Sequence, residues 1–310
     1  MKNSLLILSL CISSVAVVSA QTINKKILVE EFTGEGCVNC PRVAGYVHTS
    51  LEKEEFADNV IVVCHHSGYH DDWLTTDFDR DYKWFYNAPS TFAPGMMVDR
   101  NTPESATSPV YSISSPSMME DLWRDALAEI AGVSVNISAE HDKENKLIKV
   151  RVDGVADSSL DIENPVVTVF LVEDDIEAIH QTGAGEDYIH QHVGRAVNSS
   201  WGEPVVFNGG SYVYDYEFNV DPFWMTGNMY VVACISNYNS EDPTDCKVMN
   251  TSKLPFSDFK GLSVGIASIE AEEESEAIYT LSGIKIDSKT LSPGIYIRKK
   301  GSETSKIIIR

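Results

Sequence analysis

Two cysteines separated by two residues are the first feature of the sequence that could do chemistry, in the run Cys37-Val-Asn-Cys40-Pro41. A short β-rich run ends just before them and a helix-compatible run follows, so we expect the pair at a helix N-terminus. The positive end of the helix dipole stabilises a thiolate, which would make Cys37 the nucleophile. Cys40 is placed to displace whatever Cys37 captures and would be the resolving thiol. Pro41 suits a first helical turn.

The same spacing would also suit two roles without redox chemistry. The pair could form a purely structural disulfide, or it could supply half of a zinc site whose further ligands would come from Cys64, His65 and His66. An oxidising compartment favours a disulfide over zinc. A redox-active pair that needs no metal or organic cofactor is therefore the favoured interpretation, with the structural disulfide as its main alternative.

Histidines and carboxylates also gather in the run 64–72, which includes Cys64, His65, His66 and His70. Side chains of these types can bind zinc, copper or nickel. Alternatively, Cys64 is a core thiol, His65 and His66 point to opposite faces of a strand end, and the remainder is a polar loop. A second pair, His190 and His192, would share one face of a strand, for which we expect packing rather than metal ligation.

Length and composition limit the possible classes of protein. A chain of 310 residues suggests about two domains, and a composition of 43% hydrophobic and 23% charged residues is that of a globular protein. The formal net charge of −22 would repel a phosphate backbone, so nucleic acid is not expected as a partner.

The N-terminus reads as a cleavable signal peptide over residues 1–20. Lys2 is followed by an apolar run over 5–18, and small residues lie at the expected cleavage site. No other stretch approaches the roughly 20 apolar residues that a membrane-spanning helix needs. We therefore expect an exported protein at the outer membrane or cell surface, or alternatively in the periplasm, with peripheral membrane association at most.

Residues 21–132 have an α/β pattern that would position the cysteine pair. Apolar periodicity and turn signals predict, in order, a strand, a helix, a buried strand, a further helix, a proline-led strand, a loop and a closing helix. These elements are expected at 25–33, 43–56, 60–64, 71–87, 94–100, 101–116 and 118–130.

Residues 133–262 change to an all-β pattern, with strands expected at 133–137, 147–152, 166–172, 211–220 and 229–235. Turn signals between such strands favour an antiparallel sandwich domain. We expect Cys234 and Cys246 to form a disulfide across a long hairpin, worth about 3 kcal/mol on a chain-entropy estimate. Cys64 would then be the unpaired thiol.

Residues 263–310 are expected to form a linker and a short C-terminal β appendage. A mixed connector over 251–268 and an acidic run over 270–276 precede three strand-like runs, at 277–286, 294–298 and 306–310. Their alternating apolar residues predict short strands.

The order of elements in the first region resembles the thioredoxin fold. In that fold a cis-proline faces the cysteine pair and helps to bind an extended substrate, and the resemblance gives Pro94 this role, with Pro89 as the alternative. Two departures stand out: Gly36 replaces the usual tryptophan, and Glu35 places negative charge near the sulfur. The last hairpin strand of that fold is also not recognisable between Asn101 and Ser117.

Several runs resemble the Bacteroidetes family named for an outer membrane protein of twenty-eight kilodaltons. They are Val29 to Pro41, Met96 to Arg100, and His190 to Ala196 followed by Trp201-Gly202. This resemblance implies a thioredoxin-like domain joined to a β-sandwich domain at the outer membrane. The final block, from Tyr279 onward, is similar to the C-terminal sorting modules of the type-nine secretion pathway, which implies delivery to the cell surface.

Two functions of different classes follow from these features. The first is thiol–disulfide exchange with protein thiols or disulfides. The second is a non-catalytic surface module that binds an extracellular protein ligand, in which Cys37 and Cys40 only staple a loop. Aromatic side chains suited to such contacts are Tyr212, Tyr214, Tyr216, Phe223 and Trp224.

Overall fold

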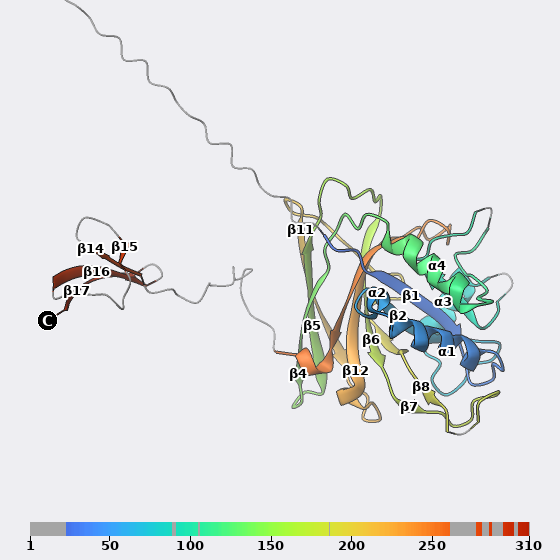
Figure 1. The fold of residues 1–310 in the computed structure, drawn as a ribbon. Coiled ribbons are helices and arrows are strands. Elements are labelled where there is room, and N and C mark those ends of the chain that lie inside the picture. The colour runs from blue at the N-terminus through green and yellow to red at the C-terminus, as the bar shows by residue number, and fades with distance from the viewer. Residues whose placement is uncertain are drawn as a thin grey trace, which may run out of the picture. The chain divides into compact units, whose positions relative to one another are not determined.

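A computed structural model describes residues 23–88, 91–104, 106–185 and 187–260, together with four strands near the C-terminus (Figure 1). The chain divides into two compact units, Met1–Leu262 and Ser263–Arg310. The expected signal peptide at 1–20 and the alternative proline, Pro89, lie outside the described residues.

The first unit is built on an eight-stranded sheet of order β13-β12-β6-β9-β2-β1-β3, with β10 pairing to β6. Its strands are β1 (Ile27–Thr33), β2 (Val60–His66), β3 (Gly95–Val98), β6 (Pro165–Glu173), β9 (Val193–Val197), β10 (Glu203–Pro204), β12 (Met229–Asn237) and β13 (Val248–Pro255). β1 and β2 are parallel, and β3 is antiparallel to β1. The buried, β-branched sequence of β2 is typical of a strand that is covered on both faces.

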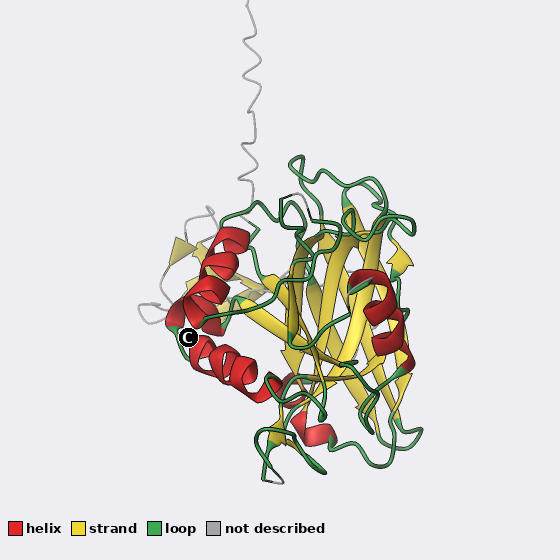
Figure 2. Ribbon diagram, turned by 90° about the vertical axis from the view of Figure 1, so that its right-hand side faces the viewer, coloured by secondary structure: helices red, strands yellow, loops and turns green. Residues whose placement is uncertain are grey.

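Helices cover both faces of the β1–β2 region (Figure 2). They are α1 (Cys40–Leu51), α2 (Glu54–Ala57), α3 (Asp77–Tyr86) and α4 (Pro116–Leu127), with short 3₁₀ turns at Thr226–Asn228 and Phe256–Asp258. α3 begins with a capping box between Thr76 and Asp79, and α4 begins at the N-cap Ser115 followed by a proline. α1, α2 and α4 pack on one face, whereas α3 packs on the other.

A second layer of strands covers the remaining part of the face on which α1 lies. This three-stranded sheet has the order β11-β5-β4 and contains β4 (Asn136–Asp142), β5 (Leu147–Val155) and β11 (Ser211–Asn219). Its inward side chains form a common core with β6 and β12. The expected antiparallel layers after residue 132 are therefore present, but one of them belongs to the large sheet.

The two regions expected on either side of residue 132 form one compact unit. β9 joins them, because it pairs with β2 at Cys64↔Val193 and with β6 on its other edge. The change near residue 132 falls between α4 and β4, inside this unit. The expected break after residue 262 coincides with the division between the two units.

Two further differences concern strands. The expected connector at 251–268 begins inside β13, which pairs with β12 from Tyr230 to Ser236. The region between Asn101 and Ser117 contributes one antiparallel bridge, Met96↔Tyr111, in place of a full strand. A single bridge leaves too little alternation in the sequence to be recognised.

The prediction of a Cys234–Cys246 disulfide is wrong, because both residues are buried free thiols. Cys64 is also a buried free thiol. The register of β12 and β13 gives the reason: Cys234 lies opposite Thr251, five residues beyond Cys246. Cys246 lies beside Asn239 instead. Five residues of extended chain span roughly 16 Å, far beyond the Cα separation of about 4.4–6.8 Å that a disulfide allows.

The second unit is a four-stranded sheet of order β15-β14-β16-β17. Its strands are β14 (Ala277–Thr280), β15 (Lys285–Ile286), β16 (Gly294–Lys300) and β17 (Glu303–Ile309). All of its pairings are antiparallel. The C-terminal β appendage expected from the sequence is thus a small sheet of its own.

Candidate functional site

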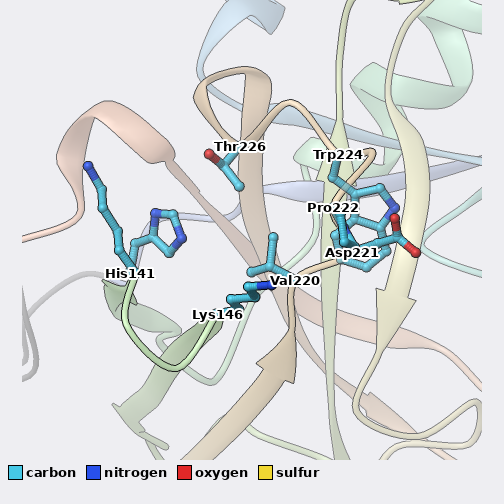
Figure 3. A pocket seen from close by; sticks show the side chains of 8 residues that line it. His141, Lys146, Val220, Asp221, Pro222, Trp224 and Thr226 are labelled. Carbon is cyan, nitrogen blue, oxygen red and sulfur yellow. The ribbon is translucent and has the colours of Figure 1, made fainter.

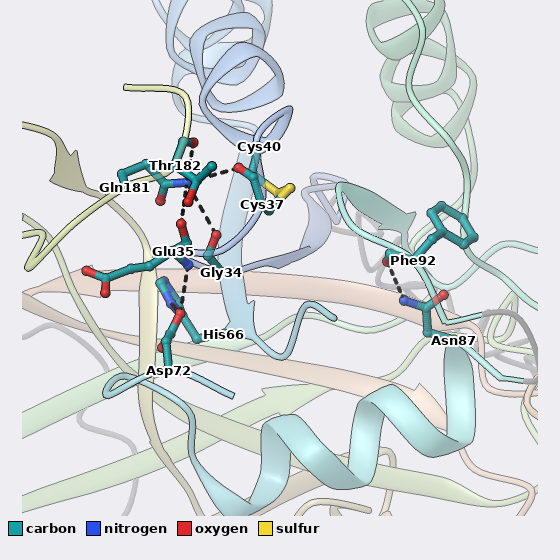
Figure 4. The surroundings of a disulfide bond; sticks show 10 residues. All are labelled: Gly34, Glu35, Cys37, Cys40, His66, Asp72, Asn87, Phe92, Gln181 and Thr182. Carbon is teal, nitrogen blue, oxygen red and sulfur yellow. Dashed lines mark hydrogen bonds and ion pairs between the residues drawn. A yellow bond between two sulfur atoms is a disulfide. The ribbon is translucent and has the colours of Figure 1, made fainter. Parts of the chain in front are cut away.

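Cys37 and Cys40 form a disulfide at the start of α1 (Figure 4). Cys37 lies in the turn that follows β1, where its amide donates to the carbonyl of Gly34, and Cys40 is the first residue of the helix. Pro41 occupies the next helical position, where no intrahelical N–H bond is lost. The pair therefore lies at the carboxyl end of parallel strands, the edge at which open α/β sheets place their functional groups.

The segment that leads into β3 packs against the disulfide. Ala93 forms a small buried cluster with Cys37 and Cys40, and the peptide bond between Ala93 and Pro94 is cis. The residue that precedes Pro94 thus contacts both cysteines. The role of Pro94 in holding a substrate stays a prediction.

The carboxylate of Glu35 points away from the sulfur atoms (Figure 4). Its Oε1 accepts hydrogen bonds from the Trp73 indole at 3.0 Å and from the backbone N–H of Ile179 at 2.8 Å. Asp72 accepts from the amide of Glu35 at 2.9 Å and also bonds His66.

A segment far away in the sequence packs on the loop that carries the disulfide. The chain between β7 (Ile176–Glu177) and β8 (Ile189–His190) carries Gln181, whose side-chain amide lies 3.0 Å from the carbonyl oxygen of Cys37 and 3.3 Å from those of Gly34 and Glu35. The amide of Thr182 also donates to the carbonyl of Glu35 at 2.8 Å. Cys37 is 4% and Cys40 1% exposed. We call residues 178–185 the cover segment.

Sequence reasoning missed the cover segment. Gly183 and Gly185 have positive φ angles and signal a turn, but the signal does not say what the turn covers. At Gly183 a Cβ atom would lie 2.5 Å from the carbonyl oxygen of Val38, so only glycine permits this close approach to the cysteine loop.

A buried ionic network lies beneath α3, on the opposite face of the sheet. Arg100 binds both carboxylate oxygens of Glu30, at 2.8 and 3.0 Å, and His65 lies between Glu30 and Asp79. Burial alone would raise the pKa of Glu30, but Arg100 and the His65 hydrogen bond lower it to about 2. Burial opposes protonation of His65, yet its bonds to Asp79 and Glu30 raise its pKa. This network is structural, because no solvent reaches it.

The histidine-rich run does not assemble a metal site in the part of the chain that the structure describes, where no three His, Cys, Asp or Glu side chains are arranged to hold an ion. His65 and His66 point to opposite faces of β2, towards the α3 network and towards Asp72 respectively. His70 is exposed. His190 packs on His66 with ring centroids 4.8 Å apart.

A separate hollow of about 200 Å³ lies beside the turn that joins β4 to β5 (Figure 3). Its lining includes His141, Lys146 and Trp224. Of the aromatic residues considered for a binding surface, Tyr212 is buried, and Tyr214, Tyr216 and Trp224 pack against the core. Phe223 is 90% exposed, so these residues do not form a continuous aromatic surface.

Comparison with solved structures identifies the fold. HBP35 of Porphyromonas gingivalis aligns with a TM-score of 0.67 at 18% sequence identity, over 93% of this chain and 99% of that one. A domain of the outer membrane lipoprotein Omp28 from Porphyromonas gingivalis aligns with a TM-score of 0.30 at 23% identity, over 41% of this chain and 89% of that one. Among curated proteins, none matches the chain. The protein thus shares the β-rich fold of HBP35.

The family follows from the sequence match. The family model of outer membrane protein Omp28 matches residues 85–254, more than half of the chain, so the protein belongs to the Omp28 family. It is accordingly an outer-membrane or cell-surface protein, as expected from the sequence. The matched region begins after Cys40 and therefore carries no information about the cysteine pair. Among the described residues, no helix is long and apolar enough to span a bilayer.

Proposed function

We propose that the protein is a thioredoxin-like oxidoreductase of the outer membrane, whose Cys37 and Cys40 exchange disulfides with protein thiols. The observation that carries the proposal is the position of the disulfide, at the start of α1 and at the carboxyl ends of β1 and β2. Support for a thioredoxin-like unit comes from the order β1, α1, α2, β2, α3, β3, α4, with parallel β1–β2 pairing and antiparallel β1–β3 pairing.

The reaction would run through a mixed disulfide. A substrate thiolate attacks the sulfur of Cys37, a new S–S bond forms, and the bond to Cys40 breaks and leaves its thiolate. A second substrate thiol then displaces Cys37, so the substrate leaves oxidised and the pair leaves reduced. The helix N-terminus stabilises negative charge at this position. Because both cysteines are buried, residues around them have to move before a protein substrate can approach.

Export and delivery complete the proposal. Residues 1–20 would be removed as a signal peptide, and the small sheet β14–β17 would act as a sorting module for the type-nine secretion pathway. An apolar leader after a lysine and the four-stranded tail support these roles.

A Cys40→Ser variant tests the exchange reaction, because it retains Cys37 and lacks the resolving thiol. It is expected to accumulate disulfide-linked adducts that a non-reducing gel resolves and that a reducing agent releases. Cys37→Ser is the matched control and should form none. Equal adduct yields from both variants, or none from Cys40→Ser, would contradict the proposal.

A second function is favoured by one observation, the burial of both cysteines in a loop to which Gln181 donates a hydrogen bond. In this alternative the disulfide staples the cysteine loop to α1, and the protein binds an extracellular protein without redox chemistry. Such a protein would keep its binding partner in the Cys37→Ser variant, whereas the oxidoreductase would lose it.

A further inference from the structure

A cavity of about 310 Å³ lies beside α1, on the side of the sheet opposite the α3 network. It is bounded by the ends of β1 and β2, by residues 41–48 of α1, and by the chain from Tyr188 to His192. Its volume lies at the lower end of the range of about 300–1,000 Å³ that is typical of small-molecule sites. The disulfide is not part of its lining, although Pro41, His66 and His190 of the site described above are.

Glu31 lies in this cavity without a counter-charge. Its side chain is 2% exposed, and its Oε1 atom has no hydrogen-bond partner. The lining contains no lysine or arginine. The neighbouring Glu30 makes the contrast clear, because it faces the other side of the sheet and is fully paired with Arg100 and His65. A buried carboxyl group that lacks a partner is costly, so its presence calls for a ligand that completes it.

The other walls suit an apolar stem. Pro41, Ala44 and Val47 supply small apolar surfaces from α1, and Tyr188 supplies an aromatic ring near the acid. Tyr188 and Glu31 are close enough to interact electrostatically, since Glu31 contributes after burial to raising the pKa of Tyr188. Aromatic rings and carboxylates together are a common environment for organic cations. At Gly45, a Cβ atom would meet nothing within 4 Å, so the helix leaves this side of the cavity open.

We propose that this cavity binds a primary alkylammonium group, with the ammonium at Glu31 and the alkyl stem along α1 and Tyr188. The group could come from a free amine or from a lysine side chain, which share this chemistry. An anion would oppose ionisation of the Glu31 carboxyl, and a neutral ligand would supply no charge that stabilises its carboxylate. A metal ion is not favoured, because the described residues hold no suitable group of ligands. The inference does not depend on the redox proposal.

Binding should be linked to proton release. Burial raises the pKa of Glu31 to about 8, so the empty cavity holds a protonated acid at neutral pH. An ammonium ion stabilises the carboxylate and expels that proton. Affinity should therefore rise with pH up to about 8, stay level above it, and fall once the ammonium itself loses its proton, near pH 10.

Other titratable groups also face Glu31 and could contribute to this pH dependence. They are His48 from α1, Cys64 and His66 from β2, and Tyr188, His190 and His192 from the chain at β8. Burial raises the pKa of Cys64 well above its usual value, and burial together with His66 lowers that of His190 to about 4. The experiment therefore compares each pH profile with that of a Glu31 variant.

Isothermal titration of the full-length protein with n-butylammonium tests the proposal, with n-butanol and butyrate as probes of the same stem. Nα-acetyl-lysine N-methylamide, in which only the side-chain amine is free, distinguishes a lysine side chain from a free amine. It binds only if the mouth of the cavity admits a peptide backbone. We expect butylammonium to bind at least tenfold more tightly than butanol or butyrate. Binding of each ligand at pH 7 should release close to one proton from Glu31. Titrations in buffers of different ionisation enthalpy measure this number.

Three variants complete the test. Glu31→Gln should weaken butylammonium binding at least tenfold and abolish proton release, whereas Glu163→Gln, an exposed charge-matched control, should change neither. Gly45→Phe should block binding and leave Glu31 intact. Equal binding of butanol, unchanged binding in Glu31→Gln, or no detectable binding of butylammonium would each overturn the proposal.

Discussion

Glu31→Gln should make the protein more stable, by an amount that grows as the pH rises. Burial raises the pKa of Glu31 from 4.5 to about 8 in the folded state. A group whose pKa is raised on folding contributes most at low pH, and its contribution falls as the pH increases from 4.5 to about 8. Glutamine has nearly the same shape and does not ionise, so the variant loses this dependence.

The size of the effect follows from the two pKa values. One pKa unit corresponds to about 1.4 kcal/mol, so the difference in unfolding free energy between variant and wild type should increase by about 4 kcal/mol between pH 5 and pH 9. Urea unfolding followed by tryptophan fluorescence measures this difference at each pH. Contributions from titrating groups that do not interact with Glu31 are common to both proteins and cancel.

The adjacent residue provides a control of opposite sign. The pKa of Glu30 is lowered to about 2, so its carboxylate stabilises the fold above pH 4.5 and loses this contribution as the pH falls towards 2. Glu30→Gln should therefore have a lower free energy of unfolding than the wild type at pH 7. This difference should become smaller as the pH falls. A stability difference for Glu31→Gln that does not change between pH 5 and pH 9 would refute the reasoning.

Three further predictions concern the cover segment, the ionic network and the thiols. Gln181→Ala removes the side-chain amide that donates to the cysteine loop, a hydrogen bond that contributes about 1 kcal/mol to stability. The variant should therefore be reduced by dithiothreitol roughly fivefold to tenfold faster than the wild type. Gln191→Ala, which removes an amide that bonds Asp175, is the control and should leave the reduction rate unchanged. Arg100→Met leaves the buried Glu30 without its partner and should lower the free energy of unfolding by about 3–5 kcal/mol, as measured in urea. Protein that starts at residue 21 should show three thiols by Ellman titration after unfolding without reductant; a count of one would restore the Cys234–Cys246 disulfide.

Much of the fold could be predicted from local patterns. The helices at α1, α3 and α4 and the strands β1, β2, β5, β6, β11 and β12 lie where periodicity and turn signals place them. The cysteine pair at the start of α1 also follows from the order of elements. These features depend on residues close together in the sequence.

The rest depends on contacts between distant segments. A single register position, Cys64↔Val193, joins the two regions into one sheet, and Gln181 reaches the cysteine loop across more than a hundred residues. Glu30 and Glu31 are indistinguishable in the sequence, yet one is paired and the other faces a cavity, because β1 is covered by different elements on its two faces. Sequence patterns report which face a residue occupies but not which element covers that face.

The reduction potential of the Cys37–Cys40 pair tests the central claim most directly. The protein would be equilibrated with defined ratios of reduced and oxidised dithiothreitol, and the free thiols would then be alkylated and counted. We expect a reduction potential above about −270 mV, within the range of disulfide oxidoreductases. A potential below about −300 mV, typical of structural disulfides, would contradict it and leave the pair as a staple of the cysteine loop.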